Sequence, residues 1–188
     1  MGREKALVHL NGKPLIDHVI ERLEPQVSDI VINTSNPDIT ARLPNAASIQ
    51  DLGNRSHGPL SGILAGMEYF LSTGVPNFLT VSVDCPFLPI NLVSRLCSAI
   101  DAEKRTVIGR SAQGNHPTIG LWPSALAPQL SEFLEQSENF SIRRFFANQD
   151  LCEVEFGQET HGTKSIDPFF NVNVAYDLEV AANFLSGA

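Results

Sequence analysis

The chain has 188 residues, of which 43% are hydrophobic and 18% are charged, and its formal net charge is −8. The length fits a single domain, and the composition is too apolar for a disordered chain. The negative charge argues against a broad nucleic-acid-binding surface, because such a surface needs a positive field. We therefore expect residues 1–188 to form one domain that does not bind nucleic acid.

Three cysteines are scattered along the chain, and their positions do not have the spacing of a metal site. A sparse, odd set of cysteines is typical of reduced thiols in a cytosol. No segment of the sequence is apolar and long enough to span a bilayer. The sequence therefore predicts a cytoplasmic protein without membrane contact.

The first third of the chain alternates between helical and strand patterns. An Asn-Gly turn at 11–12 precedes Pro14, which suits the first turn of a helix. Strands are predicted at 27–33 and, more weakly, at 46–50, and a second helix is predicted to open after Gly58. The predicted buried stripes of the two helices are Leu15, Ile16, Val19, Ile20 and Leu23 in the first, and Leu60, Ile63, Leu64, Met67 and Leu71 in the second.

The central stretch of the chain is an apolar, β-branched run that begins at Phe78 and stops at Asp84. It is long enough for one strand and too short for an ordinary helix. Runs of this type are usually buried strands of a parallel sheet. Pro86 forces Cys85 into an extended conformation, so we expect the chain to leave this strand without starting a helix.

The second half of the chain continues the alternation of helices and strands. The sequence predicts a helix over 92–100, strands at 106–110 and 116–122, helices near 124–135 and 140–148, strands at 151–156 and 169–173, a polar loop at 158–164 and a closing helix at 175–185. Strands that alternate with helices indicate an α/β fold with a mostly parallel central sheet and helices on both faces.

Three successive predicted strands of the first half end in a polar residue, namely Asn33, Asp51 and Asp84. In a parallel sheet these ends meet at one edge, where ligands bind in open α/β folds. Asn33 and Asp51 could hydrogen-bond a base or a ribose. Asp84 offers an oxygen ligand that suits Mg²⁺, which takes one or two carboxylates together with phosphates or water. The alternative is that all three are ordinary turn or cap residues.

Glycines and lysines near this edge are further candidates. Gly58 and Gly62 flank the start of a helix, where a backbone can approach a ligand closely and anions are favoured. Tight packing of the helix against the sheet is the alternative. Lys5 and Lys13 lie where a loop could reach phosphates, although lysines in a polar segment are more often solvated.

The second half of the chain offers one histidine and two asparagines as ligand candidates. His116 opens a predicted strand and could face the same crevice, although such a histidine is more often structural. Asn171 and Asn173 alternate along a predicted strand, so both should point to the same face. Two amides on an otherwise apolar strand are costly unless they are paired, which makes them stronger candidates than most residues here.

Seven motifs, taken together and in this order, resemble the molybdenum cofactor guanylyltransferases. They are Arg-Glu-Lys5-Ala-Leu, Asn-Gly-Lys13-Pro-Leu-Ile, Ile-Val-Ile-Asn33, Gly58-Pro-Leu-Ser-Gly-Ile, Val-Asp84-Cys-Pro-Phe-Leu-Pro, His116-Pro-Thr-Ile and Phe-Asn171-Val-Asn173. The motifs cover nearly the whole chain. Asn-Gly-Lys-Pro recurs across nucleotidyltransferases generally, whereas its combination with Phe-Asn-Val-Asn near the end is much more specific.

The resemblance implies a Rossmann-like nucleotidyltransferase fold and transfer of GMP from GTP to molybdopterin, with release of pyrophosphate and with Mg²⁺ as cofactor. By position, it assigns Lys5 to the nucleotide phosphates and to catalysis. Asn33 and Asp51 match guanosine-contacting positions. Asp84 matches the Mg²⁺ aspartate, close to the nucleotide and also catalytic.

On the acceptor side, the resemblance assigns Asn171, Asn173 and His116 to the pterin substrate. It also implies transient contact with molybdenum insertion or acceptor proteins. The family's glycine-rich loop would precede Arg3, so we expect the native polypeptide to carry about twenty further residues before Met1. The alternatives are a related transferase that uses CTP or another acceptor, and a non-catalytic nucleotide-binding homologue.

Overall fold

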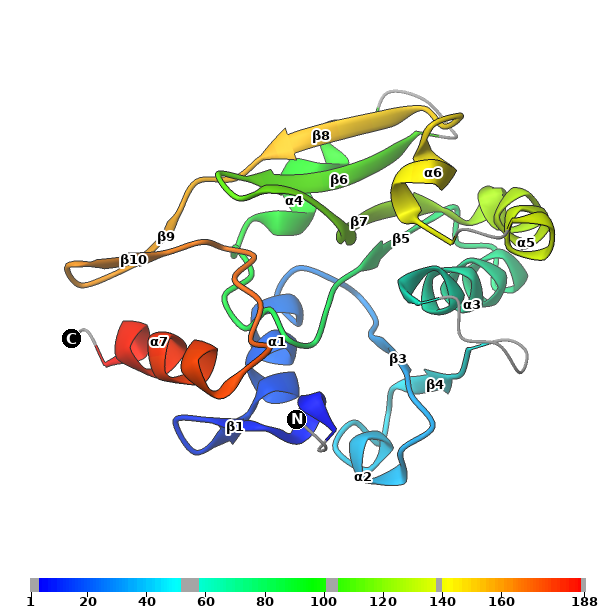
Figure 1. Ribbon diagram of the computed structural model, residues 1–188. Coiled ribbons are helices and arrows are strands. Elements are labelled where there is room, and N and C mark those ends of the chain that lie inside the picture. The colour runs from blue at the N-terminus through cyan, green and yellow to red at the C-terminus, as the bar shows by residue number, and fades with distance from the viewer. Residues whose placement is uncertain (1–3, 52–57, 101–104, 138–139, 187–188) are drawn as a thin grey trace.

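A computed structural model describes residues 4–51, 58–100, 105–137 and 140–186 (Figure 1). A four-stranded sheet in the order β5-β7-β6-β8 forms the centre of the fold. A separate two-stranded sheet pairs β3 with β4 in parallel. The strands are β3 (Val31–Asn33), β4 (Ala47–Ile49), β5 (Asn77–Thr80), β6 (Thr106–Ser111), β7 (Gly114–Pro123) and β8 (Leu151–Glu155).

Helices cover both faces of the four-stranded sheet, as the sequence predicted. Two of them, α1 and α4, contribute to the core on one face. Three others, α3, α5 and α6, build the core on the other face. Their bounds are α1 (Leu15–Leu23), α3 (Pro59–Ser72), α4 (Leu92–Cys97), α5 (Ala127–Gln136) and α6 (Ile142–Phe146).

The alternation of side chains along the strands divides these two cores. Phe78 pairs with Trp122 across β5 and β7, and the next pair is Leu79 with Leu121. Successive residues of a strand point to opposite faces of the sheet. Phe78 and Trp122 accordingly pack among α3, α5 and α6, whereas Leu79 and Leu121 pack with α1 and α4.

The central sheet is mixed rather than mostly parallel. β6 and β8 run parallel, whereas β7 runs antiparallel to both of its neighbours, β5 and β6. The cause is local, because Ser111 pairs with Gly114 and leaves only a two-residue connection between β6 and β7. Such a hairpin can join only antiparallel strands, and it places β7 beside β6. The antiparallel pairing of β7 with β5 on its other side is a separate, long-range contact.

The predicted strand over residues 78–84 is shorter in the structure. β5 ends at Thr80, and the chain then enters a turn in which the Cys85 N–H donates to the carbonyl oxygen of Ser82 at 3.2 Å. Asp84 therefore lies in a turn beyond β5 instead of closing the strand.

The buried stripe of α3 also ends earlier than predicted. Its first four apolar residues are buried, whereas Leu71 in the last turn is 47% exposed. The helix begins after Gly58, which has a φ of 64°, and it carries Pro59 in its first turn. A positive φ favours glycine, and proline suits the first helical turn, so sequence and structure agree at this boundary.

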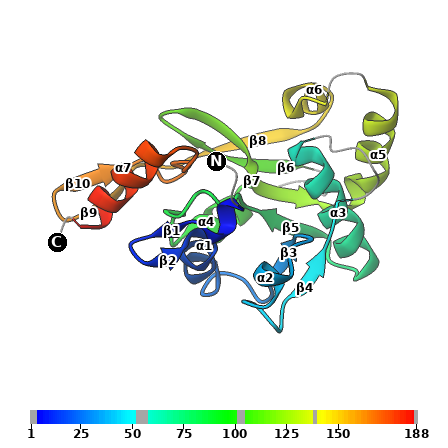
Figure 2. The same cartoon turned by 60° about the horizontal axis from the view of Figure 1, so that its bottom comes forward.

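Helix α7 and two short hairpins form a third region with its own core, which includes Leu10, Phe87 and Val172. Figure 2 shows α7 beside the hairpin of β9 and β10, which the sequence suggested only as a polar loop. The bounds are β1 (His9–Leu10), β2 (Lys13–Pro14), β9 (Glu159–His161), β10 (Lys164–Ile166) and α7 (Ala175–Leu185), and the remaining short helices are η1 (Lys5–Leu7), α2 (Pro37–Thr40) and η2 (Ser124–Leu126).

Within the described ranges, no helix is both long and apolar enough to cross a membrane.

Candidate active site

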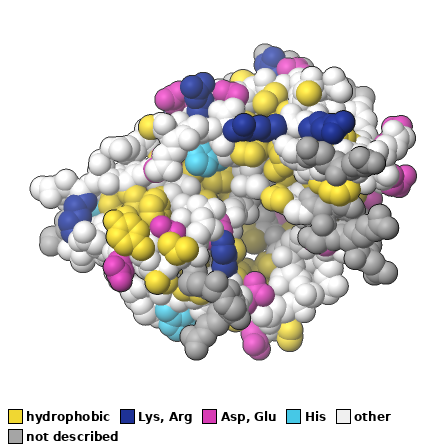
Figure 3. Space-filling view, in the orientation of Figure 1, with side chains coloured by type: hydrophobic (Ala, Val, Ile, Leu, Met, Phe, Trp, Pro, Cys, Tyr) yellow, Lys and Arg dark blue, Asp and Glu magenta, His cyan; other side chains and the backbone are white. Residues whose placement is uncertain are grey.

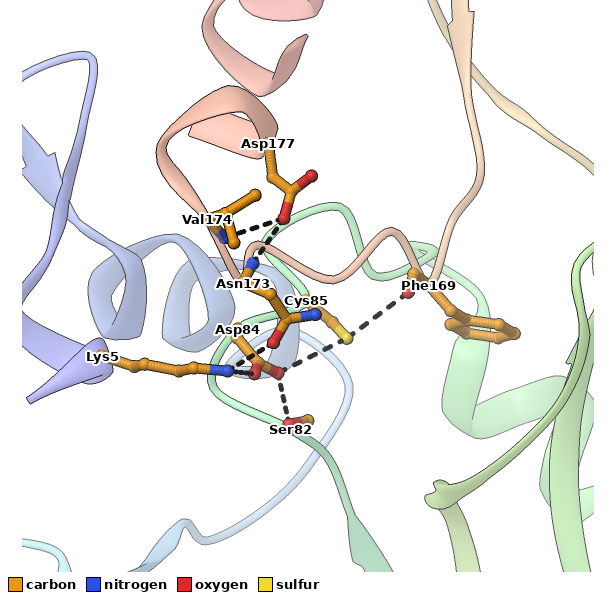
Figure 4. A network of polar contacts seen from close by, with 8 residues as sticks. All are labelled: Lys5, Ser82, Asp84, Cys85, Phe169, Asn173, Val174 and Asp177. Atoms are coloured by element: carbon orange, nitrogen blue, oxygen red, sulfur yellow. Dashed lines mark hydrogen bonds and ion pairs between the residues drawn. The ribbon is translucent and has the colours of Figure 1, made fainter. Parts of the chain in front are cut away.

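A network of polar contacts centres on Asp84 (Figure 4). Asp84 is only 6% exposed although its side chain is a carboxylic acid. The Lys5 ammonium donates to Asp84 Oδ2 at 2.9 Å, and the Ser82 hydroxyl donates to Asp84 Oδ1. Lys5 also donates to the side-chain oxygen of Asn173. The structure thus brings together Lys5, Asp84 and Asn173, which lie far apart in the sequence.

Backbone contacts hold the Asn173 segment against Asp84. The Val172 N–H donates to the carbonyl oxygen of Asp84 at 2.8 Å. One residue further on, Asp177 Oδ2 accepts the N–H groups of Asn173 at 2.8 Å and of Val174 at 2.9 Å. Asp177 lies in the first turn of α7, where an acidic side chain can satisfy N–H groups that the helix leaves free. The backbone around Asn173 is therefore held on one side by Asp84 and on the other side by Asp177.

The segment that carries the two asparagines is a loop and not the predicted strand over 169–173. Asp167 turns the chain, because its side chain accepts the N–H of Phe169 at 2.9 Å and its carbonyl oxygen accepts the N–H of Phe170 at 3.0 Å. The expected alternation persists in the burial of the side chains. Asn171 and Asn173 are exposed, whereas Val172 between them is buried.

The Cys85 thiol lies next to Asp84 but is unsuited to nucleophilic chemistry. Burial, reinforced by the negative charges of Asp84 and Asp167, raises the pKa of Cys85 to about 12. The thiol therefore stays protonated at neutral pH, and the thiolate is the reactive form. Its Sγ donates to the carbonyl oxygen of Phe169 at 3.5 Å, which indicates a packing role.

His116 lies against the same loop without joining the network around Asp84. Its ring centroid is 4.8 Å from that of Phe169, and its Nε2 lies 2.8 Å from the Ser111 hydroxyl. Burial lowers the pKa of His116 below its ordinary value, so the imidazole is neutral at pH 7. The assignment of His116 to the pterin substrate stays a prediction.

Asn33 and Asp51 form a second polar cluster at the ends of β3 and β4. The Asn33 side-chain amide donates to Asp51 Oδ1 at 2.6 Å. Parallel pairing places Asn33 opposite Ile49, two residues before Asp51. A Cβ added at Gly62 would lie 2.7 Å from Asn33 Nδ2. Gly62 thus makes room for the pair, so α3 can approach the ends of β3 and β4 closely.

The prediction that three strand-end residues lie together is confirmed only for two of them. Asn33 and Asp51 contact each other, whereas Asp84 pairs with Lys5. No hydrogen bond or ion pair among the described residues joins the two clusters. Lys13 takes no part in either, because its ammonium binds Glu21 at 2.7 Å.

The donor set around Asp84 restricts the kind of metal that the site could hold. Among the described residues, no group of three or more His, Cys, Asp and Glu side chains is arranged for a metal ion. A single protein carboxylate is a poor zinc site, because zinc takes at least three protein ligands. It does fit Mg²⁺, which usually keeps water and binds substrate phosphates alongside one or two carboxylates.

Two residues of the network were missed by sequence reasoning. Ser82 orients Asp84, and Asp177 fixes the backbone of Asn173. Asp177 could have been found, because an acidic residue at the third position of a predicted helix is a capping signal. Ser82 gives no such signal, since only the fold shows which way its hydroxyl points.

Solved structures of other proteins share this fold. Molybdopterin-guanine dinucleotide biosynthesis protein A from Archaeoglobus fulgidus superposes with a TM-score of 0.72 at 21% identity, covering 100% of this chain and 93% of that chain. The 4-diphosphocytidyl-2C-methyl-D-erythritol synthase from Anaerococcus prevotii gives a TM-score of 0.71 at 12% identity, covering 96% and 93%. The fold is therefore that of the nucleotidyltransferases.

Sequence comparisons identify the family of this chain. The family described as MobA-like NTP transferase domain matches residues 1–153. A molybdenum cofactor guanylyltransferase from Rhizobium leguminosarum bv. trifolii is 37% identical over 186 residues, covering 98% of this chain and 87% of the relative. The enzyme of the same name from Rhizobium meliloti is 37% identical over 187 residues, covering 98% and 86%. This chain belongs to the MobA-like NTP transferase family.

Proposed function

We propose that this chain transfers GMP from GTP to molybdopterin and releases pyrophosphate. The observation that carries the proposal is the meeting of Lys5, Asp84 and Asn173 in one network. Lys5 supplies a positive charge for phosphates, Asp84 supplies a carboxylate for a metal ion, and Asn173 supplies an amide for the second substrate. Relatives named for this activity align with 98% of the chain, which favours it over CTP-dependent transfer.

Lys5 is suited to hold phosphate oxygens. Its side chain is 39% exposed, whereas that of Asp84 is 9% exposed. The ammonium is therefore anchored on one side by Asp84 and reachable on the other side by an anionic ligand. A lysine is a strong point charge for phosphate, because its three N–H donors can contact several oxygens.

Asp84 would hold Mg²⁺ in this proposal, since it is the buried carboxylate at the centre of the network. When bound, Mg²⁺ supplies positive charge that neutralises the phosphates as pyrophosphate leaves. Ser82 donates to one carboxylate oxygen and Lys5 to the other, so the carboxylate is oriented before any ligand arrives.

The reaction needs no protein nucleophile. An oxygen of the terminal phosphate of molybdopterin attacks the α-phosphorus of GTP, and the bond from that phosphorus to the β-phosphate oxygen breaks. The electron pair leaves with pyrophosphate. A phosphate monoester has a second pKa of about 6 and is ionised near neutral pH, so no strong general base is required. The protonated Cys85 thiol is consistent with this mechanism.

The Asn33–Asp51 pair is suited to recognise the guanine base. Asp51 Oδ1 accepts from Asn33, and a carboxylate has further acceptor positions for a ligand. Guanine offers two adjacent donors, its ring N–H and its amino group, whereas the ring nitrogen of cytosine at the corresponding place is an acceptor.

All three cysteines are free thiols, which fits a reducing cytosol as the place of the reaction.

The proposal is tested by pyrophosphate release from each of the four nucleoside triphosphates, with molybdopterin and Mg²⁺ present. We expect release with GTP and little with the others. Preference for CTP would instead support the related transferase. Tight GTP binding without release of pyrophosphate would support a non-catalytic nucleotide-binding protein.

A further inference from the structure

Gly109 in β6 leaves a space that the ring of Phe169 occupies. A Cβ added at Gly109 would lie 2.8 Å from Phe169 Cζ and 2.9 Å from its Cε2, a separation at which one of the atoms must shift. The φ of Gly109 lies outside the left-handed region, so the backbone does not require a glycine here. A glycine inside a strand weakens the strand and often marks the close approach of another segment. The glycine is therefore explained by the room that it gives to Phe169.

The other sides of this space are filled, so the Phe169 ring has little room to move aside. The Phe156 ring lies edge-on to it, with the centroids 5.3 Å apart, and the His116 ring lies 4.8 Å away. We call Gly109, His116 and Phe156 the Phe169 seat. Figure 3 shows hydrophobic side chains gathered on the surface beside α7, but Phe169 is 1% exposed, so its ring belongs to the interior. An extra atom in a packed interior forces side chains or backbone to shift.

An irregular pairing in the β6–β7 hairpin brings His116 to the seat. Ile108 pairs with Gly120, whereas the next residue, Gly109, pairs with His116. Residues 117–119 therefore form a bulge in β7. Bulges re-aim side chains and are frequent next to active sites. The bulge thus places His116 opposite Gly109, where its ring closes one side of the seat.

The backbone of the loop that carries Phe169 is bonded to the turn that carries Asp84. The Phe169 carbonyl oxygen accepts from Cys85 Sγ at 3.5 Å, and the Val172 N–H donates to the Asp84 carbonyl oxygen at 2.8 Å. Figure 4 shows the Phe169 ring pointing away from Asp84. The ring is thus held by the seat while its backbone holds the Asp84 turn, so a shift of the ring would be passed on to Asp84.

We propose that Gly109 is a positioning residue for the transfer reaction and acts through Phe169 on the place of Asp84. The inference rests on the proposed function, because it names what holds the carboxylate where that reaction requires it. Reacting groups must be held within about 0.5 Å of their productive geometry by the residues that support them. Gly109 and the Phe169 ring supply this support from the interior and require no contact with a substrate.

The test compares Gly109→Ala, Phe169→Leu and the double variant with the wild-type protein. Alanine introduces the Cβ that collides with the ring, and leucine lacks Cζ and Cε2, the two atoms that this Cβ would meet. Gly157→Ala is the matched control, because it adds a Cβ directly after Phe156 where no atom lies within 4 Å. The measured quantities are kcat for pyrophosphate release from GTP and molybdopterin, the Kd of GTP, and Tm.

A second measurement follows the seat without turnover. Cys85 is 2% exposed, whereas Cys97 in α4 is an exposed thiol. The rate at which a thiol reagent labels each cysteine of the native protein is measured by mass spectrometry of its peptides. A displaced Phe169 carbonyl should uncover Cys85, and Cys97 shows that the reagent acts equally on every variant.

We expect Gly109→Ala to lower kcat on the order of a hundredfold, the scale of a misplacement of about 1 Å. Cys85 should be labelled faster, and the Kd of GTP should change little, because the Asn33–Asp51 pair lies outside the seat. Phe169→Leu alone should lower Tm, because it leaves space in the core. The double variant should exceed Gly109→Ala in kcat about tenfold, since changes at two residues in contact do not add. It should also regain slow labelling of Cys85.

Wild-type kcat in Gly109→Ala would overturn the inference, even if Tm were lower, because the seat would then be purely structural. A double variant with no more activity than Gly109→Ala would overturn it as well. If Gly109→Ala does not fold, a double variant that folds and releases pyrophosphate supports the inference, and one that does not overturns it.

The proposed function fails on a different result, which is the absence of pyrophosphate release by the wild-type protein. Labelling of Cys85 then decides about the seat alone. Fast labelling in Gly109→Ala that the double variant reverses would retain the seat and reject the transferase activity. Equally slow labelling of Cys85 in every variant would reject the seat.

Discussion

The Asp84 network and the Asn33–Asp51 pair are both polar clusters beside strand ends, but they are built differently. The network joins residues that are 79 and 168 positions apart around Asp84, a residue that is 6% exposed. The pair joins two exposed side chains, 18 positions apart, across adjacent parallel strands. A buried charge depends on its partners, whereas an exposed contact contributes little to stability. We therefore expect the transfer of GMP to take place at the Asp84 network, and the guanine base to be recognised by the Asn33–Asp51 pair.

Replacing Asp84 should have the largest effect. Asp84→Asn keeps the shape of the side chain and removes the charge that is assigned to Mg²⁺. We expect kcat for pyrophosphate release to fall at least about a hundredfold, the scale of deleting one key electrostatic group. We expect the variant to fold, because an asparagine oxygen can still accept from Lys5 or Ser82, but with a lower Tm, because the ion pair with Lys5 is lost. Asp150→Asn is a suitable control, since this exposed residue pairs with Arg105 and has no assigned role. Near-normal turnover of the Asp84 variant would contradict the metal role.

Replacing either asparagine before α7 should affect the acceptor rather than the nucleotide. Removing one polar interaction with a bound substrate costs about 1–3 kcal/mol, or roughly five- to 150-fold in affinity. We expect Asn171→Ala and Asn173→Ala to raise the KM for molybdopterin on this scale and to leave GTP binding little changed. Lys5 keeps its ion pair with Asp84 in both variants. Equal weakening of GTP and molybdopterin, or simple unfolding, would count against the assignment.

A change at Gly62 should weaken recognition of the nucleotide more mildly. An alanine Cβ at this position would lie 2.7 Å from Asn33 Nδ2 and would displace the Asn33–Asp51 pair. We expect Gly62→Ala to raise the KM for GTP about fivefold, the value of one net hydrogen bond. Gly157→Ala is the matched control, because a Cβ there meets no atom within 4 Å. If both variants bind GTP equally well, the pair has no role in binding the base.

The smallest effect should be a change in how stability depends on pH. Burial lowers the pKa of His116 from 6.5, so protonation favours the unfolded state. His116 therefore makes stability fall as pH decreases from about 6.5 through the lower pKa of the folded protein. We expect Tm of His116→Gln to fall less than that of the wild-type protein between pH 7.5 and 5. Parallel Tm curves for the two proteins would contradict this.

Elements with a strong periodic pattern were predictable from the sequence. α7 has the predicted bounds of 175–185, and α1 ends at Leu23, where the apolar stripe ends. The hairpin of β9 and β10 was not predicted, because its strands are three residues long and carry no apolar run. The antiparallel pairing of β7 with β6 follows from a tight turn, which a pattern of alternating helices and strands does not reveal.

The candidate site was predictable as a set of residues but not as a geometry. Lys5, Asp84 and Asn173 were identified individually, and the structure joins them. The sequence predicted that Asp84 would lie with Asn33 and Asp51 instead, because all three follow predicted strands and the ends of parallel strands meet at one edge of a sheet. The actual arrangement arises because the loop before α7 bonds to the backbone of Asp84. Contacts over this sequence separation depend on the whole fold and have no local signal.

The most direct test of the central claim follows the α-phosphate of GTP. The protein is incubated with Mg²⁺, molybdopterin and GTP that carries a label on the α-phosphorus. Direct transfer predicts that the label appears in the pterin product, with one pyrophosphate released for each label transferred and no label on the protein. Recovery of all the label in unreacted GTP, from a protein that binds GTP and Mg²⁺, would contradict the proposed activity.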